Sequence, residues 1–322
     1  MGINLYFAWW NLENLFDIET APTRPEWLQK QLGSELRGWS EAVLENKLSQ
    51  LAGIILAMND GMGPDFLGVC EVESIQVLEK LAAKLVLSGR DYGIVHADTQ
   101  DLRGIDVAFF FDRSRMRPDP DAIFNRVILK RNATRDLVQA TFTTVEGNSF
   151  IVIGNHWPSR KGGEASSEPY RMMAGETLSY WLERIHAKLG EIPVIVMGDF
   201  NDEPYNRSLC EYALSCRSID RVKSRRARNP YLYNLMWPLM GGEIATHSFD
   251  STWGMLDQIL VNRAGLAKSG ICCEQNSVSI FTAPGMIAKG APVRFGRPSE
   301  SKGYNPLGFS DHLPIVMMVL QN

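Results

Sequence analysis

Residues 194–202 read VIVMGDFND, so four consecutive apolar residues lead through Gly198 into Asp199, Asn201 and Asp202. A short apolar run that is rich in β-branched residues and bounded by glycine predicts a buried strand. Polar residues are expected in the turn after a strand, but a turn does not require two carboxylates and an amide in so few positions. We therefore expect the end of this strand to take part in chemistry.

The same change between apolar and polar residues occurs at five other places in the chain. The run FAWW ends in Asn11, FLGVC in Glu71 and FIVIG in Asn155 and His156, while MLDQILV contains Asp257 and SDHLPIVMMV begins with Asp311 and His312. An asparagine or aspartate after a single strand is ordinarily a turn former. Six polar strand ends in one chain instead predict that these side chains share a site.

The residue types at these strand ends favour a hard metal ion beside a phosphate group. Carboxylate and amide oxygens are the ligands that Mg²⁺ prefers, and Mg²⁺ takes only one or two protein carboxylates. The chain has five histidines, none with the spacing of a zinc site. Two of them, His156 and His312, lie at polar strand ends, where an imidazole can move protons near neutral pH or bind a phosphate oxygen.

The composition is that of a globular protein with a substantial core. Of the 322 residues, 45% are hydrophobic and 22% charged, and the net charge is −4. This charge gives no global positive field for nucleic acid, although a local basic patch is sufficient for binding. The five cysteines predict reduced thiols in a cytoplasmic protein. No apolar run approaches the ~18 residues of a transmembrane segment, and the chain begins as a strand and not as a signal peptide.

Periodicity predicts both helices and strands. Apolar residues recur at three- and four-residue spacing after Ser40 and after Ser74, which can cap helices, and a third helix is expected over residues 170–189. Strands are expected at residues 5–10, 66–70, 93–96, 107–111, 122–129, 138–145, 150–154, 192–197, 256–261 and 314–320. Residues 138–145 and 149–154 predict an antiparallel hairpin. Stretches 17–39, 201–250 and 262–310 have no periodic pattern, and loops of this length usually carry function or disorder.

Seven motifs together resemble the endonuclease/exonuclease/phosphatase superfamily, the group built like deoxyribonuclease I and the exonuclease-III type repair endonucleases. In the family's order they are WNLEN (10–14), GVCEV (68–72), RGIDVAFF (103–110), NHWPSR (155–160), GDFND (198–202), LDQIL (256–260) and SDHLP (310–314). The combination of GDFND with a late SDHLP is specific, and the motifs span essentially the whole chain.

The resemblance implies the fold. It is an α/β (α+β) fold, a four-layer α-β-β-α sandwich in which two mixed, mostly antiparallel sheets face each other with helices on the outside. Because pieces of one site come from both ends of the chain, we expect a single domain over residues 1–322. The motifs are expected to gather at one edge of the sandwich.

The resemblance also implies which residues handle the metal and the attacking water. Glu71 would be the main metal carboxylate, with Asn11 beside it, and the ion would be Mg²⁺ or Mn²⁺. Asp311 would be a second metal ligand or a water-mediated contact. Asp199 would orient or deprotonate the attacking water, and Asn201 would donate a hydrogen bond to the phosphate oxygens.

The two histidines take separate roles in the same resemblance. His312 would contact the scissile phosphate and take part in proton transfer, and Asp257 would hold its ring through the other nitrogen. His156 would serve the leaving-group side, as the second histidine does in the deoxyribonuclease-like branch.

Three further residues are candidate site residues because of their side-chain chemistry and their position in the sequence. Arg103 could clamp a phosphate through its planar guanidinium, although an arginine at a strand start is structural about as often. Arg160 follows NHWPS in a glycine-flanked loop and is a second candidate for phosphate contact. Asp106 is a candidate partner of His156.

One segment of the sequence bears on the substrate class: residues 221–237, which read RVKSRRARNPYLYNLMW. Five positive charges on eight residues are followed by Tyr231, Tyr233 and Trp237. Basic residues that track a backbone, with aromatic residues that stack on bases, are typical of a single-stranded nucleic-acid contact. A solvated surface loop with a hydrophobic anchor explains the pattern equally well. A third interpretation is peripheral membrane contact, which would favour a lipid phosphodiesterase.

We expect a metal-dependent phosphodiester hydrolase, a nuclease that cleaves DNA or RNA by attack of a water activated at the metal site. The alternative is a phosphatase or phosphodiesterase that acts on lipid or small-molecule phosphoesters. The inositol-phosphatase signature is missing, since residues 252–258 read TWGMLDQ. A catalytically silent binding module with the same fold is the second alternative, but it would not need Glu71, Asp199, Asn201 and His312 together.

Overall fold

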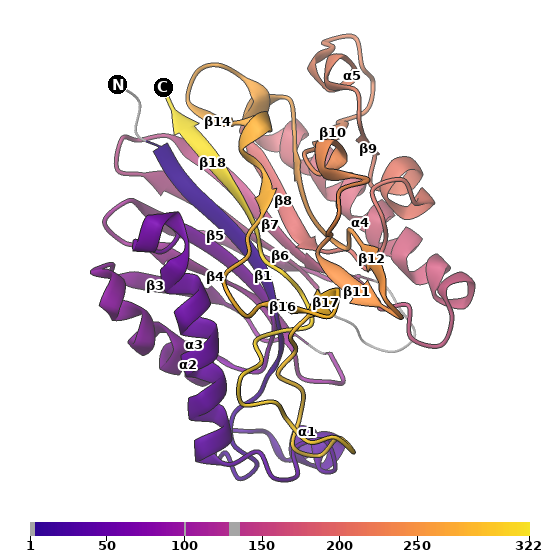
Figure 1. The fold of residues 1–322 in the computed structure, drawn as a ribbon. Coiled ribbons are helices and arrows are strands. Elements are labelled where there is room, and N and C mark those ends of the chain that lie inside the picture. Colours follow the sequence, from indigo (N-terminus) through magenta and orange to yellow (C-terminus); the bar gives the residue numbers. More distant parts are fainter. Residues whose placement is uncertain (1–3, 100, 129–135) are drawn as a thin grey trace.

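Two large β-sheets form the centre of the molecule (Figure 1). The computed structural model describes residues 4–99, 101–128 and 136–322. The first sheet has the order β14-β18-β1-β2-β4-β3, with β15 also paired to β18. Its strands are β14 (Ile271–Cys273), β18 (Ile315–Gln321), β1 (Asn4–Leu15), β2 (Phe66–Val72), β4 (Asp106–Asp112), β3 (Tyr92–His96) and β15 (Ser279–Ile280). Only β1 and β2 are parallel among these pairs.

The second sheet has the order β5-β6-β7-β8-β13-β10-β9. Its strands are β5 (Met116–Arg126), β6 (Leu137–Thr144), β7 (Ser149–His156), β8 (Val194–Asp199), β13 (Asp257–Val261), β10 (Leu232–Asn234) and β9 (Ser215–Cys216). The pairs β7–β8 and β10–β9 are parallel and the others antiparallel. Two small ribbons, β11 (His247–Phe249) with β12 (Thr252–Gly254) and β16 (Ile287–Ala288) with β17 (Ala291–Pro292), lie outside the large sheets.

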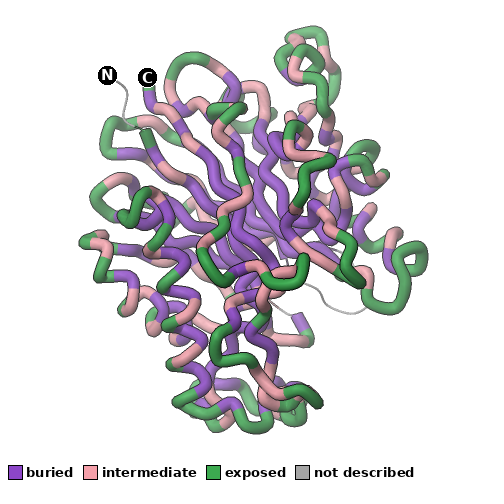
Figure 2. Tube along the Cα trace, in the orientation of Figure 1, coloured by how far each residue is buried: buried purple, intermediate pink, exposed green. Residues whose placement is uncertain are grey.

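The alternation of side chains along the strands divides the core into three layers. In β8, Ile195 and Met197 belong to the cluster between the two sheets, whereas Val194 and Val196 pack with helix α4 (Glu164–Leu189). The outer face of the first sheet packs on α2 (Glu41–Ala57) and α3 (Ile75–Leu85). Helix, sheet, sheet and helix are therefore the four layers, and Figure 2 shows the buried strands at the centre and exposed loops at the rim. This is the predicted fold.

The predicted helices form where local signals place them. The Ser40 and Ser74 hydroxyls accept hydrogen bonds from the backbone nitrogens of Val43 and Val77, which caps α2 and α3. The third helix begins before its expected start and runs from Glu164 to Leu189. Two shorter α-helices are α1 (Glu26–Leu32) and α5 (Ile219–Lys223). Single helical turns occur at Asn59–Gly61, Val86–Ser88, Ser208–Tyr212, Trp237–Leu239, Ala264–Leu266 and Gln275–Ser277.

The other elements predicted from the sequence differ from the structure mainly in where they begin and end. The strand expected at 122–129 is the second half of β5, which begins at Met116, and Leu129 lies outside the described residues. The hairpin of β6 and β7 is confirmed. The three stretches without a periodic pattern contain α1, α5 and several two- or three-residue strands. Among the described residues, no helix is long and apolar enough to cross a membrane.

Candidate active site

The ends of five strands and the segment before β18 bring the predicted site residues together. In the second sheet, His156 and Asp257 both pair with Asp199, because β8 lies between β7 and β13. Gly198 permits this close packing, since a Cβ atom there would lie 2.5 Å from the Asn155 carbonyl oxygen. In the first sheet, Asn11 pairs with Cys70, so that it lies next to the end of β2 that carries Glu71.

The backbone is unusual at several of these strand ends. Glu13, Asn14, Glu71 and Asn201 have φ angles of 51°, 55°, 61° and 50°, in the left-handed region that non-glycine residues rarely adopt. Glu71 lies in an irregularity of the β2–β4 pairing, and its Oε2 accepts a hydrogen bond from the backbone nitrogen of Asn14 at 2.9 Å. Residues held in sparsely populated conformations cluster at functional sites.

His312 and Asp257 form a buried pair. The His312 Nδ1 and Asp257 Oδ2 atoms are 2.6 Å apart, and the Trp9 indole donates to the other carboxylate oxygen of Asp257 at 3.0 Å. Burial lowers the pKa of His312, but the charges of Asp257 and Asp199 outweigh it, so that the pKa lies well above its usual value. His312 Nε2 is left facing Asp199, 3.8 Å from Oδ2. The structure thus provides the pair that was predicted, and its catalytic role stays a prediction.

Asp199 is surrounded by groups that hold its carboxylate in place. Asn11 Nδ2 donates to Oδ2 at 3.1 Å, and the Asn201 backbone nitrogen donates to Oδ1 at 2.9 Å. His156 Nε2 lies 3.7 Å from Oδ2. Burial raises the pKa of Asp199 to about 7, with the neighbouring Asp257 charge adding to the effect and His312 opposing it. A carboxylate with this pKa is suited to accept a proton near neutral pH.

The donors near Glu71 fit a hard cation. Burial raises the pKa of Asp311, and the Glu71 carboxylate nearby adds to this increase, so a bound cation would relieve unfavourable negative charge. Among the described residues, the possible ligand atoms of Asp311, His247 and His312 lie within 4.8 Å of one another, and no such group of three includes Glu71. A metal ion shared by Glu71 and Asp311 therefore stays a prediction. Asn11 directs its amide nitrogen to Asp199, while its Oδ1 accepts a hydrogen bond from the backbone nitrogen of Glu13. Oxygen donors of this kind suit Mg²⁺ or Mn²⁺ better than Zn²⁺.

His247 belongs to this region, although no sequence pattern singled it out. Its ring centroid is 4.6 Å from that of His312, and the two residues form an isolated backbone bridge. Burial, together with the charge of His312, lowers the pKa of His247 to about 3. His247 thus packs as a neutral ring beside a charged one. Its place depends on the β11–β12 ribbon, which short-range periodicity does not show.

A second missed feature is a buried clamp between β1 and the segment before β18. Glu13 is 1% exposed and accepts hydrogen bonds from Arg294 Nε at 2.7 Å and from the backbone nitrogens of Phe295 and Gly296. Lys47 of α2 is fully buried, and its Nζ donates to the Phe309 carbonyl oxygen at 3.3 Å. The clamp holds residues 294–309 just before Asp311 and His312.

The two predicted phosphate-binding arginines differ in their surroundings. Arg103 donates to Asn14 Oδ1 at 2.8 Å and lies 3.8 Å from Glu71, with its side chain 40% exposed. Arg160 donates to the Asn201 carbonyl oxygen and to Asp202 and Asn206, so it holds the loop that carries Asn201. Arg103 is therefore the more accessible of the two, and phosphate contact by either remains a prediction.

Asp106 does not pair with His156, and this expectation was wrong. Its Oδ2 lies 3.1 Å from His96 Nε2, and its Oδ1 accepts hydrogen bonds from the backbone nitrogen and hydroxyl of Thr99. The reason is the register of β3 and β4, which pairs His96 with Ala108 on the same strand as Asp106.

The basic segment lies at the opposite end of the second sheet. Strand β10 pairs with Val261 and Leu260, the end of β13 that is farthest from Asp257. The apolar residues of the segment are core residues, because Leu232, Leu235 and Met236 are fully buried. They are therefore not available to enter a membrane. Tyr231 is in contact with the Arg221 guanidinium, 4.0 Å from the ring centroid.

Comparisons with known proteins agree with this geometry. A model described as the Endonuclease/Exonuclease/phosphatase family matches residues 6–321. The search of curated proteins found no match. Among solved structures, D. rerio TDP2 complexed with single strand DNA product is 15% identical, with a TM-score of 0.59 and 98% of each chain covered.

Two other solved structures are similar to the same extent. The human Nocturnin catalytic domain with bound sulfate is 18% identical, with a TM-score of 0.56, 98% of this chain and 94% of that chain covered. A mannosyl-6-phosphatase of Bacteroides thetaiotaomicron is 16% identical, with a TM-score of 0.57 and coverage of 98% and 99%. These likenesses show the fold, and the family match extends over nearly all of the sequence. The chain belongs to the endonuclease/exonuclease/phosphatase family.

Proposed function

We propose that this protein is a metal-dependent phosphodiester hydrolase, and specifically a nuclease. One observation carries the proposal: the buried His312–Asp257 pair, the Asp199 carboxylate and the Glu71–Asp311 carboxylates meet at one end of the two sheets. Hydrolysis of a phosphodiester needs a proton acceptor for water, stabilisation of charge on the phosphoryl oxygens and help for the leaving alkoxide. Each of these needs has a candidate group at this end of the sandwich.

Glu71 and Asp311 would hold Mg²⁺ or Mn²⁺ with Asn11 beside them, and the bound ion would stabilise charge on the phosphoryl oxygens. Asp199 would take a proton from the attacking water as the new P–O bond forms. Asn201 would donate from its amide nitrogen to a phosphoryl oxygen, since among the described residues that group makes a single hydrogen bond, to the Trp157 carbonyl oxygen at 3.0 Å.

The two histidines would act on the phosphate and the leaving group. With Nδ1 held by Asp257, His312 would present Nε2–H to a phosphoryl oxygen as a charged donor. His156 lies between Glu71 and Asp199, with Nε2 3.7 Å from each carboxylate, and would assist departure of the alkoxide when the old P–O bond breaks. General acid–base help of this kind contributes ~10²–10⁴-fold.

The alternative substrate class is a small phosphoester. The similar mannosyl-6-phosphatase acts on such a compound, whereas the similar TDP2 structure contains a single strand DNA product. We favour nucleic acid because residues 221–228 carry five positive charges, a feature that a small substrate does not require. A cytoplasmic location and a single domain over residues 1–322 are part of the same proposal.

A substrate panel tests this function. The purified protein is incubated with Mg²⁺, with Mn²⁺ or with EDTA, and with single- and double-stranded DNA, RNA, and chromogenic phosphodiesters and monoesters. We expect metal-dependent cleavage of polynucleotides and of the diester, with little release from the monoester. Rapid monoester hydrolysis without polynucleotide cleavage would establish the phosphatase alternative, and full activity in EDTA would contradict the metal site.

A further inference from the structure

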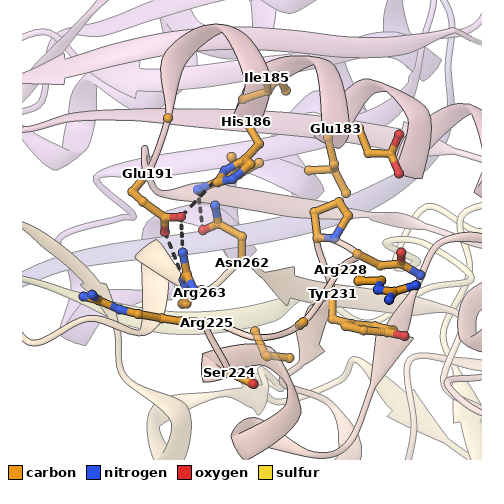
Figure 3. Close-up of a pocket in the computed structure, with 17 residues that line it drawn as sticks. Glu183, Ile185, His186, Glu191, Ser224, Arg225, Arg228, Tyr231, Asn262 and Arg263 are labelled. Carbon is orange, nitrogen blue, oxygen red and sulfur yellow. Dashed lines mark hydrogen bonds and ion pairs between the residues drawn. The ribbon is translucent and has the colours of Figure 1, made fainter.

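A cavity lies at the end of the sandwich opposite the candidate active site. It has a volume of about 270 Å³ and lies between the C-terminal part of α4 and residues 224–231, with Val194 and Asn262 in its lining. Figure 3 shows Arg225, Arg228 and Arg263 around it, together with Glu191 and His186 of the α4 side. The cavity therefore touches the first residue of β8, whereas Asp199 is the last residue of that strand.

Positive charge surrounds this cavity and two hollows next to it. We call the seven cations that line them the basic end: Arg221, Lys223, Arg225, Arg226, Arg228, Arg263 and Lys268. Three carboxylates, Glu183, Glu191 and Asp220, share these linings. The chain as a whole has a net charge of −4, so this concentration of cations is a local excess.

Most cations of the basic end are not neutralised within the protein. Glu191 forms an ion pair with Arg263, and Arg221 is used in its contact with Tyr231. Within the described parts of the chain, the guanidinium groups of Arg225, Arg226 and Arg228 make no hydrogen bond or ion pair, although Arg225 adds to the effect of Arg263 in lowering the pKa of Glu191. Three exposed arginines within four positions repel one another, and an anionic partner would relieve that repulsion.

The surroundings favour a phosphate backbone over a membrane surface. Val222, Leu232, Leu235 and Met236 of the basic segment are buried and Trp237 is half-buried, so the aliphatic side chains of this segment are not available as a membrane anchor. The Arg221 guanidinium lies over one face of the Tyr231 ring and donates to its hydroxyl, so that face is already occupied. What remains exposed is guanidinium, which binds phosphate oxygens without reading sequence.

We propose that the basic end is a second contact for the phosphate backbone of a polynucleotide, remote from the bond that is cleaved. This inference rests on the proposed nuclease function. Strand β8 has six residues, so its two ends are roughly 16 Å apart at ~3.3 Å per residue. A strand in a duplex advances ~3.4 Å per phosphate, so about five base pairs or more are needed to reach both ends. The contact would therefore act as a tether for long substrates only.

Binding measured without catalysis tests the proposal. In EDTA, the affinity for labelled oligonucleotides of about four to thirty nucleotides, single-stranded and duplex, is measured between about 50 and 200 mM salt. The triple variant Arg225→Gln/Arg226→Gln/Arg228→Gln, called the Arg225 variant below, should lose the increase in affinity that wild-type protein shows as the oligonucleotide becomes longer. Its log–log salt slope should decrease by up to ~2, since each contact to a single strand contributes ~0.7. With a slope difference of ~2, a fourfold salt change alters the ratio of the two affinities by up to roughly 16-fold.

The control variant removes the same charge elsewhere. Lys30→Gln/Lys84→Gln/Arg113→Gln changes three surface cations that each form an ion pair with a neighbouring carboxylate. The control variant should keep the wild-type dependence of affinity on oligonucleotide length and on salt concentration. Equal losses in both variants, or no loss in the Arg225 variant, would overturn the proposal. A second variant, Lys223→Gln/Lys268→Gln, should show a smaller loss of the same kind.

Two further measurements distinguish a failure of the basic-end proposal from a failure of the proposed nuclease function. If the Arg225 variant keeps its affinity for oligonucleotides but loses binding to vesicles that contain phosphatidylserine, the basic end serves a membrane and the proposal is wrong. With Mg²⁺, the Arg225 variant should hydrolyse a small chromogenic diester at the wild-type rate, while KM for long polynucleotides rises. If oligonucleotides bind through the basic end but are never cleaved, the nuclease function fails and the binding inference stands.

Discussion

At one end of β8, Asp199 lies among buried carboxylates and histidines, whereas at the other end Val194 lines the same cavity as Arg225 and Arg228. Figure 1 shows the course of β8, and Figure 3 shows the two arginines. Charged groups have different effects in the two environments. At the buried end, burial and the neighbouring charges together set proton affinities, and burial raises the pKa of Asp199 to about 7. At the exposed end, salt screens the charges, and they act on binding more than on protonation. Changes at the two ends should therefore alter different measured quantities.

The largest effect is expected from the His312–Asp257 pair. Asp257→Ala and His312→Ala should each lower kcat by ~10²–10⁴-fold on a small diester, because each removes the oriented donor. The double variant should be little worse than the more damaging single variant. Additive losses would mean that the two residues do not share one role. By comparison, the Arg225 variant should leave this kcat unchanged.

The clamp at Glu13 should dominate stability. Glu13→Ala leaves the buried backbone donors of Phe295 and Gly296 without their acceptor, at about 1–3 kcal/mol each, and should lower the free energy of unfolding by about 2–6 kcal/mol. The matched surface change Lys30→Ala, in a pair with side chains 75% and 83% exposed, should cost less than about 1 kcal/mol. Urea unfolding of both variants measures the difference, and equal small losses would show that the clamp is not stabilising.

The two adjacent histidines should respond to pH in opposite directions. His247 has a folded pKa of about 3, below the ~6.5 of an unfolded histidine, so the unfolded state binds its proton first as pH falls. Its contribution to stability is present above pH ~6.5 and is lost between that pH and about 3. The pKa of His312 is raised, so its contribution is present below pH ~6.5 and is lost as pH rises through the folded value.

Imidazole NMR of the metal-free protein measures both histidines. His312 should titrate at a higher pH than an ordinary histidine, and Asp257→Asn should lower its pKa. His247 should remain neutral at pH 5, and replacing it by asparagine should reduce the loss of stability between pH 6.5 and 4. A His312 that titrates at or below the ordinary ~6.5 would contradict the assignment of Asp257 as its charged partner.

Local patterns were sufficient for the elements that local interactions decide. The helices after Ser40 and Ser74 follow from a cap and apolar spacing. Strand β8 follows from an unbroken apolar run, because both of its faces pack on core layers. The gathering of Asn11, Glu71 and His312 could be predicted because the motifs resemble a family whose strand ends converge. From periodicity alone, each of these residues would have been interpreted as part of a separate turn.

Features that depend on distant segments could not be predicted in this way. Glu13 and Arg294 are 281 positions apart, and neither has a neighbour in sequence that indicates the other. The same holds for Arg171, fully buried in α4, whose Nε lies 2.8 Å from Asp202 Oδ2. The charge of residues 221–228 was evident, but its location away from Asp199 is set by the pairing of β10 with the far end of β13.

The most direct test of the central claim is the metal dependence of Glu71→Gln. This change keeps the size of a side chain that lies between Asn14 and His156 but removes its charge. Mn²⁺ binding is followed by electron paramagnetic resonance, and diester hydrolysis and Tm are measured on the same samples. We predict weaker Mn²⁺ binding and a loss of roughly 10²–10³-fold or more in kcat, with Tm in the absence of metal nearly unchanged. Wild-type Mn²⁺ affinity together with wild-type turnover in Glu71→Gln would contradict the account.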